Sequence, residues 1–138
     1  MDRNTVEEKL RRYKREEKED MLVMVPICQN GYVTAYLRPL TFDYKSSLPG
    51  IVCALSEWRR ENSYAWASTF DVTDERTEMW LKKYVLEKKD RIIFVIQDLN
   101  NHYIGQIGLA GFDYNEKSVE IDAVVRGKKD VLPGIMGA

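Results

Sequence analysis

The chain has 138 residues, a formal net charge of −1 and charged side chains at 31% of its positions. A chain of this length folds as one domain with a sizeable core, and without a basic excess it is not expected to bind nucleic acid. Hydrophobic residues make up 44% of the sequence, but no uninterrupted apolar run reaches the ~18 positions of a membrane span, so we expect a cytoplasmic protein that does not associate with membranes.

Few residues are suited to metal binding or nucleophilic catalysis. Cys28 and Cys53 are the two cysteines, and they lack the spacing of metal ligands, so we expect reduced, buried thiols and no metal site. His102 is the single histidine, and it falls in a predicted turn, where a surface position is favoured. A hydrolase built on a Ser–His or Cys–His pair is therefore not expected.

Residues 1–20 are a dense mixture of charged side chains, with Val6, Leu10 and Tyr13 at helical spacing. One narrow apolar stripe is typical of a solvated helix attached to a larger body. We therefore predict a charged N-terminal helix over residues 1–20 and one domain over residues 21–138. A tether to an upstream domain or a subunit contact is the alternative role of this helix.

Two β-rich segments, residues 21–28 and 32–40, flank Asn30-Gly31. An Asn-Gly pair supplies the positive φ angles of a type I′ turn, so these segments predict a β-hairpin. Pro26 is expected on its outer strand, where a missing amide costs least.

Two helices are expected between this hairpin and the next strand. In the first, Ser47 is a candidate cap and Pro49 occupies the first turn. Its predicted inner face consists of Ile51, Leu55 and Trp58. In the second, Thr73 is the candidate N-cap. Its predicted apolar face consists of Trp80, Leu81, Tyr84 and Val85.

The last part of the chain predicts an antiparallel meander with strands over residues 91–97, 102–112 and 119–126. Glycines at 105, 108 and 111 in the middle strand indicate sheet curvature or the close approach of another group. In the last strand, Val119, Ile121, Ala123 and Val125 alternate with Glu120, Asp122, Val124 and Arg126. The alternation predicts that the first set faces the core and that Glu120 and Asp122 share a face.

The strand pattern ends after Gly127, Pro133 and Gly134 mark a turn, and the small and apolar residues 135–138 can open a helix. A strand, a glycine-bearing turn and a helix N-terminus together form an anion site. The first amides of a helix lack intrahelical partners, and the macrodipole places partial positive charge there. A phosphate-bearing ligand would suit this arrangement.

Residues 119–138 resemble the cofactor-binding core of the GNAT superfamily of N-acetyltransferases. Val119-Glu120-Ile121 resembles the family segment that carries a general-base glutamate. Gly134 stands at the family's central loop glycine, with Leu132 where a second glycine is usual. The strand ending at residues 37–41, the two helices and the run 103–108 follow the family's order. The resemblance covers residues 32–138, the first half of a family domain.

The resemblance implies an α+β fold of three α/β layers, a mixed, mostly antiparallel sheet with flanking helices, truncated here after the strand and loop that lead into the cofactor helix. It implies transfer of an acetyl group from acetyl-CoA, the co-substrate, to a primary amine. Glu120 is the candidate general base, and Asp122 is its alternative. The implied cofactor-binding residues are Ala123, Val124, Val125, Arg126, Gly134, Ile135, Met136, Gly137 and Ala138.

Residues 57–62 resemble the end of the first helix in family members that acetylate nucleotide-linked amino sugars. The candidate substrate-binding residues are then Trp58, Tyr64 and Trp66, although loop aromatics also fill cores. The candidate acceptor is a small amine such as a nucleotide-linked amino sugar, and a protein or peptide amine is the alternative.

Without the family's second half, the strand over residues 119–126 is expected to be an exposed edge. Such an edge favours pairing with a second copy in a homodimer. We accordingly expect a fragment that is inactive by itself. A non-catalytic domain that serves as an interaction partner is the other functional class.

Overall fold

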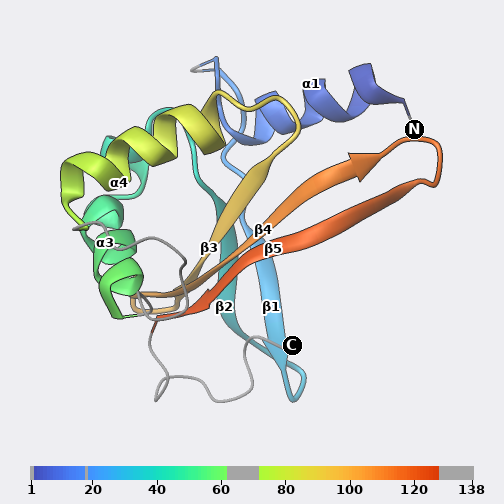
Figure 1. Ribbon diagram of the computed structural model, residues 1–138. Coiled ribbons are helices and arrows are strands. Elements are labelled where there is room, and N and C mark those ends of the chain that lie inside the picture. Colours follow the sequence, from blue (N-terminus) through green and yellow to red (C-terminus); the bar gives the residue numbers. More distant parts are fainter. Residues whose placement is uncertain (1, 18, 62–71, 128–138) are drawn as a thin grey trace.

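The computed structural model of the chain describes residues 2–17, 19–61 and 72–127. Within these residues, five antiparallel strands form a sheet in the order β1-β2-β3-β4-β5, with helices on both faces (Figure 1). The strands are β1 (Val25–Gln29), β2 (Tyr32–Pro39), β3 (Ile92–Asp98), β4 (Tyr103–Asp113) and β5 (Ser118–Arg126). The helices are α1 (Arg3–Tyr13), α2 (Tyr44–Ser47), α3 (Ile51–Glu61) and α4 (Asp74–Leu81), which a π-helical turn, Lys82–Leu86, extends. The predicted α+β class is confirmed.

The β1–β2 hairpin turns at Asn30-Gly31, as predicted. Asn30 has a φ of 52° and Gly31 a φ of 83°, the pair of positive values that a type I′ turn requires. Because β1 is an edge strand, Pro26 lies where its missing amide costs least, which confirms its predicted position. In the part of the chain that the structure covers, no helix is long and apolar enough to cross a bilayer.

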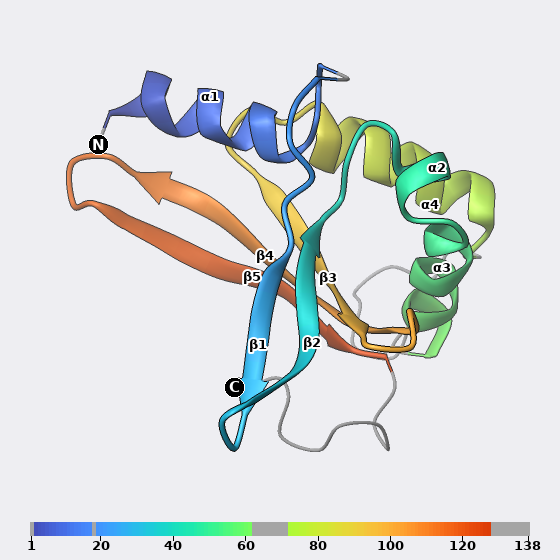
Figure 2. The same cartoon turned by 180° about the vertical axis from the view of Figure 1, so that it is seen from behind.

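Helix α1 lies across one end of the sheet, near the start of β3 and the β4–β5 hairpin (Figure 1; Figure 2). Val6 and Leu10 are buried in a cluster with Ile92, and Tyr13 packs against that cluster. The predicted apolar stripe is therefore the side of α1 that contacts the sheet. The helix ends at Tyr13, so it is shorter than the predicted residues 1–20.

Lys14 follows α1 directly, and it is only 2% exposed. Its Nζ donates hydrogen bonds to the carbonyl oxygens of Val85 at 2.9 Å and Lys88 at 2.5 Å. Carbonyl groups at the end of a helix lack intrahelical donors, and a lysine amine satisfies them. One buried side chain thus joins the end of α1 to the end of α4.

The start of α3 differs from the prediction. We predicted one helix capped by Ser47 with Pro49 in its first turn, but α2 ends at Ser47 and α3 begins at Ile51. The ring of Pro49 disfavours a helical conformation at the preceding residue, and Leu48 has a φ of −132° and a ψ of 63°. Gly50 then adopts a φ of 78°, and this left-handed residue separates the two helices.

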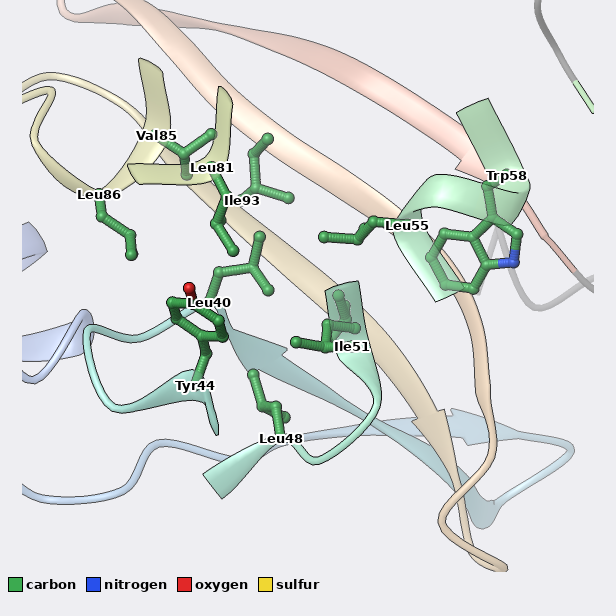
Figure 3. Packing of buried hydrophobic residues seen from close by; sticks show 11 residues of the cluster. Leu40, Tyr44, Leu48, Ile51, Leu55, Trp58, Leu81, Val85, Leu86 and Ile93 are labelled. Atoms are coloured by element: carbon green, nitrogen blue, oxygen red, sulfur yellow. The ribbon is translucent and has the colours of Figure 1, made fainter. Parts of the chain in front are cut away.

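The main hydrophobic cluster lies between the sheet and helices α3 and α4. Ile51, Leu55 and Trp58 are at most 3% exposed, which confirms the predicted inner face of α3. Ile51 and Leu55 point into the cluster, whereas Trp58 lies at its margin (Figure 3). The cluster therefore extends along α3 towards the edge of the sheet.

The apolar face of α4 is only partly as predicted. Thr73 caps the helix through its hydroxyl, and Leu81 and Val85 are fully buried. Tyr84, in contrast, is 48% exposed. The π-helical turn Lys82–Leu86 is wider than an α-helical turn, so the spacing of an ideal helix does not hold there.

The prediction of buried thiols is wrong, since Cys28 and Cys53 are both free and exposed. Cys28 follows a register shift in the edge strand β1, between Ile27 and Cys28. On α3, Ile51 and Leu55 are buried, and Cys53 between them lies on the outer side of the helix. Neither thiol contributes to the core.

Candidate functional site at strand β5

Strand β5 carries the candidate catalytic residues and contains a β-bulge. Its pairing with β4 shifts register twice, once near the hairpin between Ala110 and Asp113 of β4, and again between Asp122 and Val125 of β5. Between these positions, one residue of β4 faces two residues of β5, Ala123 and Val124. Ala123 has a φ of 51°. One extra residue shifts a pattern of period two by one position, so the bulge reverses which residues of β5 face the helices.

This reversal overturns part of the predicted pattern. Ala123 and Val125 do pack against the main cluster. Val119 and Ile121 do not face it, and they are 41% and 65% exposed. Val124, the second residue of the bulge, is 53% exposed. The residues between Val119 and Ala123 that face α3 and α4 are therefore the two acids.

Asp122 is held in place by two neighbours. Its Oδ2 lies 3.4 Å from Nη2 of Arg91, and its carboxylate lies over the backbone of β4. A Cβ atom on Gly108 would be 2.5 Å from Oδ1 of Asp122, so close approach explains this glycine. Oδ1 is buried and accepts no hydrogen bond within the described residues.

Glu120 faces the same side of the sheet as Asp122, because the two residues pair with Ala110 and Gly108, which alternate in β4. It is exposed. Its carboxylate lies beside Gly111, where an added Cβ would be 2.9 Å from Oε2. Among the hydrogen bonds and ion pairs of the described residues, none involves Glu120. This carboxylate is therefore accessible to a ligand, whereas that of Asp122 is restrained.

Two guanidinium groups flank the ring of Trp80 on this face. The Cζ atoms of Arg59 and Arg91 lie 5.2 Å and 5.9 Å from the ring centroid, within the range of cation–π attraction. Burial lowers the pKa of Arg59. Nη1 of Arg91 also donates to the carbonyl oxygen of Tyr84 at 3.3 Å. Arg91, at the start of β3, thus places positive charge beside Asp122, and Trp80 of α4 lies between it and Arg59 of α3.

The backbone of β5 beyond the bulge presents groups to the outer edge of the sheet. The amide of Gly127 donates to the carbonyl oxygen of Ile104 in β4 at 3.0 Å. Because hydrogen-bonding direction alternates along a strand, Val125 also points towards β4. The amide and carbonyl groups of Val124 and Arg126 point the other way, where the described sheet has no further strand.

Trp58, a predicted substrate-binding residue, is a core side chain beside the end of β5. A Cβ atom on Gly127 would lie 2.0 Å from its Nε1, so the indole packs directly on the backbone there. Its contact with substrate stays a prediction. Tyr64 and Trp66 lie outside the described residues, as do the predicted loop residues Gly134, Ile135, Met136, Gly137 and Ala138.

Sequence reasoning missed Arg91 and Gln106. Gln106 is 4% exposed, and its Nε2 donates to the carbonyl oxygen of Ala123 at 2.8 Å. A glutamine inside an otherwise apolar strand could have pointed to Gln106. If such an amide is buried, it nearly always has a hydrogen-bond partner, which here is a backbone group of the site. Arg91 stands at the edge of a β-branched run and carried no comparable signal.

The histidine and metal predictions concern other parts of the molecule. The side chain of His102 is 70% exposed, in agreement with the predicted surface position. Its Nδ1 lies 3.3 Å from Oδ2 of Asp98, whose other oxygen accepts from backbone amides of the β3–β4 turn.

Within residues 2–17, 19–61 and 72–127, no group of three or more His, Cys, Asp or Glu side chains is arranged to hold a metal ion.

No model of a known protein family and no curated protein sequence matches the chain. Among solved structures, it is similar to the crystal structure of a GCN5-related N-acetyltransferase from Brucella melitensis, with a TM-score of 0.52 and 19% sequence identity. Over the matched part, the chain shares the fold of that acetyltransferase. The match covers 78% of this chain but 46% of the solved chain, so the chain spans less than half of that protein's length. At this level of identity, the similarity establishes the fold alone.

Proposed function

We propose that the chain carries the acyl-CoA strand and the general base of an N-acetyltransferase, which transfers an acetyl group from acetyl-CoA to a primary amine. The observation that carries this proposal is the bulged edge strand β5 within an acetyltransferase fold. Because the chain spans 46% of the solved structure, the activity of a whole enzyme is part of the proposal.

The edge of β5 suits the pantetheine arm of acetyl-CoA. This arm is an extended chain with amide groups, and such a chain pairs with a sheet edge as an added strand does. Val124 and Arg126 direct backbone groups to that edge. The arm then lies along β5 at Val124 and Arg126, on the C-terminal side of Glu120 and Asp122. Its thioester end points towards these two acids.

Glu120 is the proposed base. The amine must lose a proton before or during its attack on the thioester carbonyl, and an accessible carboxylate can accept that proton directly or through water. The attack forms a carbon–nitrogen bond, the carbon–sulfur bond breaks, and coenzyme A leaves as the thiolate, which then takes up a proton. Asp122 is paired with Arg91, so we assign it a positioning role.

For the acceptor, we propose a small primary amine, with nucleotide-linked amino sugars as the first class to test. The resemblance of residues 57–62 to the amino-sugar branch supports this choice. The two arginines beside Trp80, one of which is paired with Asp122, provide positive charge that suits an acceptor that carries phosphate groups. Turnover with nucleotide-linked amino sugars but not with peptides would support it, and the opposite preference would favour a protein or peptide amine.

The test of the proposed function is calorimetric titration of acetyl-CoA into the chain, and into a longer product if its gene encodes one. Val124→Pro removes the outward amide and also restricts the preceding residue, Ala123, so it is expected to weaken acetyl-CoA binding by about tenfold or more, tenfold being the value of one hydrogen bond. Val124→Ala keeps that amide and is the matched control. Adenosine 3′,5′-bisphosphate, which lacks the pantetheine arm, should not distinguish the two variants. Absence of acetyl-CoA binding to both the chain and the longer product would contradict the proposal.

The second candidate is a non-catalytic domain whose edge strand β5 pairs with a second copy of the chain. It is favoured by the exposed apolar side chains of β5, which are Val119, Ile121 and Val124. Sedimentation equilibrium tests it. A dimer that Ile121→Lys dissociates, together with no acetyl-CoA binding, would make this the better account.

A further inference from the structure

The side chain amide of Gln106 is buried on β4, the strand that pairs with the edge strand β5 of the candidate site. It is 4% exposed, and its Nε2 donates to the carbonyl oxygen of Ala123 at 2.8 Å. A buried amide without a partner costs free energy, so it is retained only where it is hydrogen-bonded. The hydrogen bond shows that the partner of this buried amide is the carbonyl group of Ala123.

That carbonyl belongs to the bulge. Gln106 stands opposite Val125 in the β4–β5 register, and Ala123 is two residues earlier, so the hydrogen bond crosses the bulge diagonally. Ala123 has a φ of 51°, a left-handed conformation that costs an alanine about 1 kcal/mol. The bulge interrupts the backbone ladder between β4 and β5 at this position. The side chain of Gln106 supplies the donor for this carbonyl.

The bulge determines which backbone N–H and C=O groups of β5 point to the outer edge of the sheet. With it, the acids of β5 face α3 and α4, Ala123 and Val125 share that face, and Val124 and Arg126 direct their amides outward. Without it, strict alternation would continue from Asp122, so Val124 would turn towards the helices and Val125 towards the outer face. The hydrogen-bonding groups beyond position 123 would change sides as well.

We propose that Gln106 is a positioning residue of the acyl-CoA site, which holds the bulge of β5 through the carbonyl oxygen of Ala123. The part of this inference that concerns acetyl-CoA rests on the proposed function. The part that concerns the bulge rests on the structure alone. It adds to the site a residue that touches neither reactant and that lies on the neighbouring strand.

The test separates these two parts. Backbone carbon chemical shifts of Ala123 report its φ by NMR, and calorimetry reports acetyl-CoA affinity. Gln106→Met keeps the length of the side chain but removes the donor, and it should abolish the left-handed signature of Ala123 and weaken acetyl-CoA binding about tenfold. Gln97→Met is the matched control, because Gln97 is also a buried glutamine, 6% exposed, and donates to the carbonyl oxygen of Asn101 at 3.3 Å in the β3–β4 turn. It should leave both readouts unchanged.

Gln106→Glu provides a second test, which remains informative if Gln106→Met does not fold. An ionised carboxylate only accepts hydrogen bonds, whereas a protonated carboxyl group can donate to Ala123. The left-handed signature should be absent at neutral pH and should return as the pH is lowered, while the wild-type chain shows no such change.

The outcomes are distinct for the two proposals. If Ala123 keeps its conformation in both Gln106 variants, Gln106 does not hold the bulge and the inference is overturned. If Ala123 changes but acetyl-CoA affinity does not, Gln106 holds the bulge without positioning the ligand, which also overturns it. A wild-type chain that binds no acetyl-CoA overturns the proposed function, and the chemical shifts then still decide whether Gln106 holds the bulge.

Discussion

The guanidinium group of Arg91 lies 3.4 Å from the carboxylate of Asp122, and this ion pair joins the start of β3 to the edge strand β5. The same guanidinium donates to the carbonyl oxygen of Tyr84 at 3.3 Å. Arg91 therefore connects the π-helical turn after α4 to the candidate site. Because both side chains are largely enclosed, at 21% and 34% exposure, loss of one partner leaves a charge in a poorly hydrated position.

The first prediction compares the two acids of β5 in stability. Asp122→Asn should lower the free energy of unfolding by about 1–3 kcal/mol, because Arg91 loses its charged partner. Glu120→Gln makes the same chemical change on the same face, without an ion pair, and should change stability by less than about 0.5 kcal/mol. Urea unfolding of the two variants measures the difference. Equal losses would mean that the Arg91–Asp122 pair does not contribute.

The second prediction concerns turnover. Glu120→Gln should lower kcat by about 100-fold, the usual size of a general-base contribution. Its acetyl-CoA affinity should stay near the wild-type value, because the cofactor contacts come from the backbone beyond the bulge. Steady-state kinetics and calorimetry on the active form of the protein provide the two measurements. Unchanged turnover would remove Glu120 from the mechanism.

The elements that the sequence predicts well carry their own local signal. Asn30-Gly31 sets a turn by its backbone preferences, and Thr73 caps a helix through its own hydroxyl. The facing of β5 was predicted correctly at Val125 but wrongly at Val119 and Ile121, because the extra residue between them places the residues before the bulge on the opposite face from that expected by alternation back from Val125. The bulge is coupled to a side chain on the neighbouring strand, Gln106, and period-two alternation within β5 contains no information about that contact.

The third prediction tests the contact between α3 and the end of β5. A Cβ atom on Gly127 would lie 2.0 Å from Nε1 and 2.1 Å from Cε2 of Trp58, and the indole is part of a packed core. Gly127→Ala should therefore destabilise the fold by about 1–3 kcal/mol, the usual cost of overpacking.

A double-mutant cycle provides the control for this contact. Trp58→Phe removes the part of the ring system nearest Gly127, so Gly127→Ala should cost less in that background than in the wild-type chain. Chemical unfolding of the four proteins gives the coupling free energy. Additive losses would show that the two residues do not meet.

The fourth prediction concerns pH and Lys14. Burial lowers the pKa of Lys14 from 10.5 to about 8, with the carboxylates of Asp90 and Glu16 opposing this shift. The folded state therefore releases the proton of Lys14 at a lower pH than the unfolded state does. Between about pH 8 and pH 10.5, the unfolded state binds more protons, so raising the pH favours folding.

The measurement is the free energy of unfolding of the wild-type chain minus that of Lys14→Met, across this pH range. The difference should rise from pH 8 to pH 10.5, because the cost of burying a charged amine disappears. A neutral amine still has two N–H groups for the carbonyl oxygens of Val85 and Lys88, so both hydrogen bonds persist. A difference that stays flat or falls with pH would mean that the charged amine is the form that these carbonyls stabilise.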